Sequence, residues 1–274
     1  MDNLRIRAAI EADIPGICHV NRGEEGPWAE PESCAGYVQN RLKNGFYIQV
    51  AEWEGRIVGH GEWIVSDERR WKTFYLGQLQ VDPEFQSRGV GREMLVDGVA
   101  QAKRRGCESI SLFPETDTGS QHFYEKRGLK RGKDILRCAL PSQNGPFKGK
   151  IIEEAPREIV KESPFLFGLT QTAAEHMWQV FNRRPAGEGR RVDTLAGDGF
   201  ILQLGAFRKS DNALLLAWGE PENAREIVRT ARAFAFALDY PGVEFNFFSD
   251  HPALPACFAG QDVIPENYEM YLEF

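Results

Sequence analysis

A glycine-containing segment near residue 90 has the residue types needed to bind a diphosphate. It reads VDPEFQSRGVG from Val81 to Gly91, and an amphipathic stretch follows it. Its two glycines leave the backbone open, so an anion can approach the N–H groups closely. A helix starting here would add unpaired N–H groups and a partial positive charge, and Arg88 and Arg92 would add side-chain donors. The segment is therefore typical of a phosphate-binding loop.

The elements predicted around this loop place it between a strand and a helix. We expect strands at Leu4–Ala8, Phe46–Trp53, Arg56–Val65, Phe74–Val81, Ser109–Phe113 and Asp134–Ala139, and helices near Ile14 and at Cys34–Leu42, Gly89–Arg105 and Gln121–Lys126. In the helix after the loop, the apolar residues are spaced for one buried face. This order of elements predicts an α/β (α+β) fold, in which helices cover a mixed sheet.

The whole arrangement resembles the GCN5-related N-acetyltransferase (GNAT) family over roughly residues 4–140. The resemblance is specific at two places. Gln86, Ser87, Arg88, Gly89, Val90 and Gly91 match the family's pyrophosphate loop, and Phe123, Tyr124, Glu125, Lys126, Arg127 and Gly128 match its helix beside the CoA arm. The resemblance implies a GNAT fold, acetyl-CoA as cosubstrate and transfer of its acetyl group to an amine.

The resemblance also implies roles for the strand before the loop. That strand is expected to separate from its neighbour after Val81, and the CoA arm is expected to pair with the backbone of Leu79, Gln80 and Val81, much like an added strand. A backbone N–H in this segment would bind the thioester carbonyl oxygen.

Tyr124 is the expected acid. In the family a tyrosine at this position gives a proton to the departing thiolate, which reference pKa values of about 10 for a phenol and about 8.5 for a thiol allow. Arg92, Ser120 and Phe123 complete the cofactor contacts that the resemblance implies. Asp117 stands where the family often has Asn, so this chain keeps an acceptor and loses a donor.

The expected base is missing from its usual place. Members that act on histones carry a glutamate at a position that Tyr75 occupies here, and the strand Phe74–Val81 contains no carboxylate. Glu62 and His60 have the same side-chain parity on the adjacent strand, and Glu62 is the preferred candidate. A water chain, or an amine of low pKa that needs no base, remains an alternative.

The substrate side of this family is usually built by the first two helices and their loop. Glu24, Glu25 and Trp28 lie there, and an aromatic face beside carboxylates suits a cation. We therefore expect a small-molecule primary amine as the acceptor.

The second half of the chain repeats the order of elements without the chemistry. We expect a catalytic domain at residues 1–140, a linker rich in Pro and Gly at 141–163 and a degenerate GNAT-like copy at 164–274, which makes two tandem copies of the fold. Where a diphosphate would have to bind, the copy carries Glu220, Glu222 and Glu226 and has no glycine pair. Because these charges would repel the ligand, we expect one CoA per chain.

Composition restricts the remaining classes. Residues 1–150 have a net charge of +1 and residues 151–274 a net charge of −8, so nucleic acid is not expected as the partner, whereas an acidic half can attract a cation. Neither a membrane span nor a secretory signal is predicted. The five cysteines are scattered without a CxxC pair, which predicts reduced thiols, a cytoplasmic protein and no metal site.

Three alternatives stay open at this point. They are another acyl-CoA donor, a peptide α-amine as the acceptor, and a regulatory protein that binds acyl-CoA without turnover. The absent strand carboxylate favours the regulatory protein, and Tyr124 argues against it. The sequence leaves the oligomeric state open.

Overall fold

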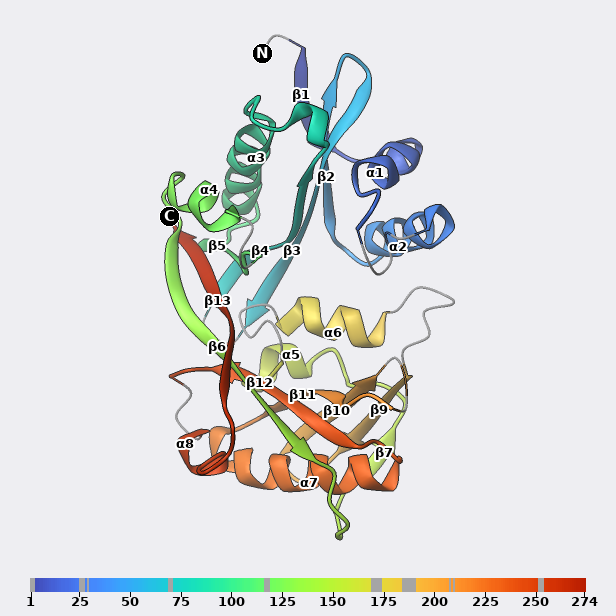
Figure 1. The fold of residues 1–274 in the computed structure, drawn as a ribbon, viewed down its shortest axis with the longest axis vertical. Coiled ribbons are helices and arrows are strands. Elements are labelled where there is room, and N and C mark those ends of the chain that lie inside the picture. Colours follow the sequence, from blue (N-terminus) through green and yellow to red (C-terminus); the bar gives the residue numbers. More distant parts are fainter. Residues whose placement is uncertain are drawn as a thin grey trace.

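The computed structural model describes residues 3–24, 28, 30–68, 71–115, 119–168, 174–183, 191–206, 208, 210–250 and 254–274. It has two lobes, one above the other in Figure 1, and two long strands run between them. Among the described residues, no helix is long and apolar enough to cross a bilayer.

The first lobe contains the elements from the N-terminus to β6. Its strands are β1 (Leu4–Ala8), β2 (Tyr47–Trp53), β3 (Arg56–Glu68), β4 (Trp71–Val81), β5 (Ser109–Leu112) and β6 (Lys130–Pro141); its helices are α1 (Ile14–Val20), α2 (Pro31–Lys43), α3 (Val90–Arg104) and α4 (Ser120–Glu125). Helices α1 and α2 cover one face of the sheet, and α3 and α4 cover the other (Figure 1). Helix α3 buries Val90, Met94, Leu95 and Ala102, as its apolar spacing predicts.

The second lobe repeats this order of elements. Its strands are β7 (Lys150–Ile152), β8 (Phe165–Phe167), β9 (Arg191–Ala196), β10 (Phe200–Ala206), β11 (Ala213–Gly219), β12 (Gly242–Phe248) and β13 (Ile264–Glu273); its helices are α5 (Ile159–Glu162), α6 (Ala174–Asn182), α7 (Ala224–Ala237) and α8 (Leu254–Cys257). Strands β9, β10 and β11 form an antiparallel meander, and α7 then leads to β12, which is parallel to β11. The same pattern connects β2, β3 and β4 through α3 to β5.

The two lobes exchange strands. In the described part of the chain, thirteen strands form one sheet, in which the main path runs β1-β2-β3-β4-β5-β13-β6-β12-β11-β10-β9-β7 and β8 pairs with β11. The C-terminal strand β13 thus lies between β5 and β6 of the first lobe, and β6 continues into the second lobe beside β12. The mixed sheet predicted from the sequence is confirmed. Because residues 264–273 supply a central strand of the first lobe, a fragment ending near residue 140 would lose part of its sheet.

The expectation that all five cysteines are free thiols is wrong for two of them. Cys18 in α1 and Cys34 in α2 form a disulfide, with their Cα atoms 5.8 Å apart. The two cysteines are 16 residues apart in the sequence, and only the packing of α1 on α2 brings them to bonding distance. Cys107, Cys138 and Cys257 are free.

Candidate active site

Strand β4 has a bulge and an open edge. Opposite β3, Glu62 pairs with Gln78 and Trp63 pairs with Leu76, so Gly77 is an extra residue without a partner. On the other side, the parallel pairing with β5 ends at Leu76. The expectation that β4 separates from its neighbour after Val81 is therefore wrong in position, because the separation starts five residues earlier, at the bulge. Among the described residues, the β5-facing edge of β4 therefore has no partner strand from Gly77 to Val81.

This open edge reaches solvent. Gly77 is exposed although it lies within a sheet of the first lobe, and Gln78, Leu79, Gln80 and Val81 are half-buried. Because a backbone edge at this depth presents N–H and C=O groups in strand geometry, it can accept an extended polar ligand as an added strand.

The loop after β4 has the shape that the glycines predict. Ser87 has φ 59° and Gly89 has φ 85°, so the backbone turns through the left-handed region twice before α3 begins at Val90. Gln86, Ser87, Arg88 and Arg92 are exposed, and Gly89 and Gly91 are half-buried. The Gln86 side chain donates to the Val81 carbonyl over 3.1 Å and so connects the loop to the open strand. The first N–H groups of α3 therefore face the position that a diphosphate would occupy.

Arg127 belongs to this surface, although it is not among the site residues predicted from the sequence. Its guanidinium lies 3.6 Å from the centre of the Phe123 ring. Burial and the neighbouring positive charge of Arg92 hold the pKa of Arg127 below its usual value. Its Nε is buried and has no hydrogen-bond partner in the described structure. Two adjacent cations, one with an unpaired donor, indicate an anion site. In the sequence, Arg127 stands out as part of the run Lys126, Arg127 and Gly128 at the end of the second motif.

Tyr124 lies beside the open edge of β4. It is 8% exposed, and among the described residues its hydroxyl has no hydrogen-bond partner. Burial raises the pKa of Tyr124 above its ordinary value, so the phenol keeps its proton at neutral pH. Burial raises the pKa of Tyr75 of β4, and the nearby charges of Glu62 and Tyr124 raise it further. Tyr124 is therefore a protonated group available to a ligand on β4.

Ser120 and Phe123 hold the ends of this helix in place. Ser120 Oγ donates to the Glu115 carbonyl over 2.9 Å at the start of α4. The Phe123 ring packs against Gly91, where an added Cβ would lie 3.3 Å from it. Asp117 and Glu25, both predicted site residues, lie outside the described residues.

Glu62 lies in a buried ionic cluster. Its carboxylate is 2% exposed, receives hydrogen bonds from the Tyr37 hydroxyl at 3.1 Å and pairs with Arg41 Nε at 3.2 Å. Burial raises the pKa of Glu62, and Arg41 and the Tyr37 hydrogen bond oppose this effect. Both oxygens of the predicted base are therefore already engaged by α2.

A polar network covers the same face of β4 next to α1. Gln78 Nε2 donates to Asn21 Oδ1 at 2.8 Å, and Asn21 Nδ2 lies 3.2 Å from His60 Nδ1. Gln80 Nε2 donates to Glu24 Oε1 at 3.1 Å. Trp28, which is buried, presents its ring at 5.4 Å from the His60 ring. The predicted substrate residues Glu24 and Trp28 thus meet β4 close to its open edge.

His60 gives a prediction on acid stability. It is fully buried, and burial lowers its pKa from 6.5 to about 3, so only the unfolded chain binds a proton between these values. Stability is therefore independent of this group above about pH 6.5 and falls below it, by roughly 2 kcal/mol at about pH 5. We expect the loss measured by urea unfolding over this pH range to be smaller in His60→Gln, which keeps an acceptor for Asn21, than in wild type, by this amount. Buried His176, whose pKa is also lowered to about 3, contributes equally in both proteins. Equal losses in both proteins would contradict the prediction.

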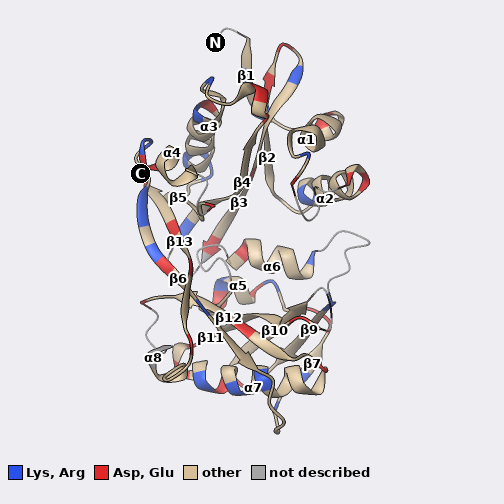
Figure 2. Cartoon of the chain, viewed as in Figure 1, with Lys and Arg blue, Asp and Glu red and all other residues tan. Residues whose placement is uncertain are grey.

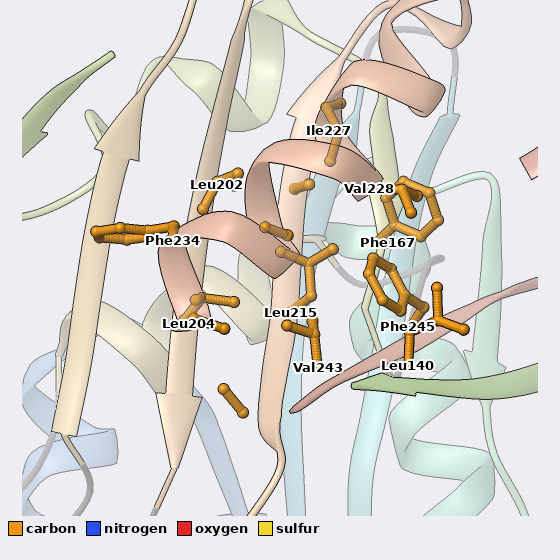
Figure 3. Close-up of a cluster of buried hydrophobic side chains, with 14 of the residues drawn as sticks. Leu140, Phe167, Leu202, Leu204, Leu215, Ile227, Val228, Phe234, Val243 and Phe245 are labelled. Carbon is orange, nitrogen blue, oxygen red and sulfur yellow. The ribbon is translucent and has the colours of Figure 1, made fainter. Parts of the chain in front are cut away.

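The corresponding site in the second lobe is filled by the chain itself. Strand β8 pairs with the end of β11 through Ala217 and Trp218, and Gly168 N donates to Asn246 O of β12 at 2.9 Å. β8 therefore lies between β11 and β12, where the equivalent edge of β4 is open. Figure 3 shows Phe167 of β8 among the buried side chains of this lobe, beside Phe245.

The loop of this second site also differs from the first. Its helix α7 starts after Asn223, whose φ of −81° is ordinary, and Glu226 is paired with Arg229. Along α7 the charged residues are Arg225, Glu226, Arg229 and Arg232 (Figure 2), and Glu220 and Glu222 come just before the helix. Neither the backbone nor the charges here suit a diphosphate.

We therefore expect one CoA per chain. Isothermal titration of the intact protein with CoA should give a stoichiometry near one, because β8 and the acidic loop exclude the second site. A stoichiometry near two would require β8 to leave the sheet and would contradict this prediction.

Comparison with known proteins finds similarity to acetyltransferases in the first half of the chain. The Acetyltransferase (GNAT) family model matches residues 17–129. An uncharacterised N-acetyltransferase of Methanocaldococcus jannaschii is 27% identical over 106 residues, which are 37% of this chain and 45% of that protein. A mycothiol acetyltransferase of Propionibacterium freudenreichii is 26% identical over 138 residues, 47% of this chain and 43% of that protein. This chain thus spans less than half the length of these two curated relatives.

The whole fold has a counterpart as well. A tandem GNAT protein from the clavulanic acid biosynthesis pathway has a TM-score of 0.61 at 15% identity, and the match covers 98% of both chains. The fold is therefore similar to that of a tandem GNAT protein. Residues 17–129 are a domain of the Acetyltransferase (GNAT) family.

Proposed function

We propose that this protein transfers the acetyl group of acetyl-CoA to a primary amine of a small molecule. The observation that carries the proposal is the open edge of β4 from Gly77 to Val81, which lies between a phosphate loop and a buried, protonated Tyr124. A pantetheine arm needs such an edge, and a thioester on it would lie within the polar network of α1.

The residues present fit acetyl-CoA along its whole length. The loop from Gln86 to Arg92 would hold the diphosphate through N–H groups and cationic side chains, with Arg127 as a further donor. The backbone of Leu79, Gln80 and Val81 would pair with the arm, and Ser120 and Phe123 belong to α4. Asp117 remains a contact predicted from the sequence. The cosubstrate supplies an activated acetyl group with a thiolate as leaving group.

Tyr124 completes the transfer in this proposal. As the bond from the acetyl carbon to sulfur breaks, the Tyr124 hydroxyl gives its proton to the thiolate. The raised pKa keeps the phenol protonated until then. A backbone N–H of β4 stabilises the charge on the thioester oxygen. Glu62 remains a predicted proton acceptor, and its contacts with Tyr37 and Arg41 also suit a role in ordering α2 beside the acceptor.

The chemistry of the cleft supports a small amine. Glu24 and Trp28 offer a carboxylate and an aromatic surface next to β4. Helix α6 of the second lobe contacts β3 and lies below α2 in Figure 1. A helix packed next to the acceptor side leaves less room for a peptide than for a small molecule, and a mycothiol acetyltransferase is among the relatives.

Thiol release from acetyl-CoA tests the proposal. Ethanolamine, putrescine, glucosamine and glycinamide are assayed beside a peptide with a free α-amine. We expect turnover with at least one small amine and an acetylated product by mass spectrometry. Tight CoA binding without turnover of any acceptor would favour the regulatory alternative, and turnover of the peptide alone would favour a peptide N-acyltransferase.

A further inference from the structure

Helix α6 brings a histidine from the second lobe to the bulge of β4. The point where a Cβ on Gly77 would lie is 3.6 Å from His176 Nε2 and 3.7 Å from the Glu62 carbonyl oxygen. Gly77 is exposed, so this point lies at the solvent-exposed end of the open edge. His176 Nε2 and the Glu62 carbonyl oxygen thus both border the space beside Gly77.

The fold fixes His176 from several sides. Its ring packs on Tyr75 at 5.1 Å and on Phe46 at 5.9 Å. Helix α6 is docked to β3 by the Glu175 N–H, which donates to Ser66 Oγ at 3.4 Å. Its far face is anchored in the second lobe, where Trp178 Nε1 donates to the Ala155 carbonyl at 2.9 Å. The position of Nε2 relative to β4 is therefore a property of the assembled pair of lobes.

His176 has no polar partner in the described structure. Its Nδ1 is buried and makes no hydrogen bond, and no ion pair involves the ring. The charged and titratable groups that face it are Arg41 and Tyr37 from α2, Glu62 from β3 and Tyr75 from β4, whereas Glu175 of α6 is paired with Arg157. Burial and the positive charge of Arg41 lower its pKa to about 3, so the ring is neutral at physiological pH.

We propose that His176 Nε2 binds the nitrogen of the acceptor amine at the Gly77 bulge and takes its proton during transfer, an inference that rests on the proposed function. The neutral amine donates a hydrogen bond to Nε2 and attacks the acetyl carbon. As the C–N bond forms, the nitrogen becomes a strong acid and passes one proton to Nε2. The C–S bond breaks, Tyr124 protonates the thiolate, and the proton on His176 returns to the tyrosinate through solvent. An amide and free CoA result.

His176 suits this task better than Glu62 in geometric terms. The Glu62 oxygens already receive the Tyr37 hydroxyl and pair with Arg41, and the side chain is 2% exposed. His176 Nε2 instead faces the bulge at Gly77, and no described residue forms a hydrogen bond with it. A neutral imidazole accepts a hydrogen bond and has no charge that would attract a carboxylate. It therefore favours ligands that donate a hydrogen bond, such as amines.

Three variants test the proposal with the amine that wild type uses best. His176→Phe keeps a ring of similar size and removes both nitrogens, so kcat/KM for the amine should fall by about 10²–10⁴ while the Kd of CoA and the melting temperature hold. His176→Gln keeps an acceptor but no base, so KM should stay near wild type while kcat falls. His176→Ala should regain activity when free imidazole is added, which a purely structural role would not allow.

The comparison with Glu62→Gln decides between the two acceptors. A larger loss in Glu62→Gln than in His176→Phe, or a His176→Phe variant within threefold of wild type, would overturn the proposal. If wild type turns over no amine, the proposed function fails. His176 is then judged by the ¹⁵N-histidine spectrum of CoA-saturated protein. A shift of the His176 signal on adding ethanolamine or glycinamide supports the site, and an unchanged signal overturns it.

Discussion

Replacing Tyr124 by Phe is expected to lower kcat by about 10²–10⁴ without weakening CoA binding. The substitution removes one hydroxyl and keeps the ring that packs against Phe123 at 5.0 Å. The hydroxyl has no hydrogen-bond partner among the described residues, so its loss leaves no other group unpaired. Steady-state thiol release and isothermal titration of CoA measure the two quantities separately.

Tyr268→Phe is the matched control for this experiment. Tyr268 belongs to the same hydrophobic cluster as Tyr124, but its hydroxyl donates to Gln121 Oε1 at 2.7 Å. We expect the control to keep wild-type kcat. Full turnover in Tyr124→Phe would remove this hydroxyl from the mechanism, and equal losses in both variants would point to packing instead.

The fold of each lobe could be predicted from local pattern, but the exchange between the lobes could not. Apolar spacing placed α3, and alternating residues placed β3 and β4 within a few residues of their ends. Hydrophobic periodicity and turn residues carry no information on which distant strand fills a gap in a sheet. Nothing local in residues 264–273 or 130–141 distinguishes a strand paired within its own half from one exchanged with the other.

The candidate site divides in the same way. The loop from Gln86 to Gly91 has a local signature, because left-handed backbone at Gly89 requires a residue without Cβ. His176 comes from the second lobe, and Arg127 is recognised as a site residue because the charge of Arg92 lies next to it in space. Contacts of this kind depend on tertiary packing. The disulfide between Cys18 and Cys34 was missed for the same reason.

Replacing Gly89 by Glu is expected to weaken CoA binding by about 10- to 100-fold, which corresponds to the roughly 1.5–3 kcal/mol of charged hydrogen bonds at the diphosphate. Gly89 has φ 85° and caps α3, so a side chain there strains the loop and places a carboxylate beside the N–H groups that would bind phosphate. Gly260→Glu is the control, because Gly260 has φ 78° and no atom within 4 Å of its Cβ position, yet lies between α8 and β13. The control carries the same added charge and a similar backbone strain, but it lies outside the Gln86–Arg92 loop and the open edge of β4. Isothermal titration should therefore show wild-type CoA affinity for the control. Wild-type affinity in Gly89→Glu itself would mean that the diphosphate binds elsewhere. The loop from Gln86 to Arg92 would then not be the phosphate-binding loop.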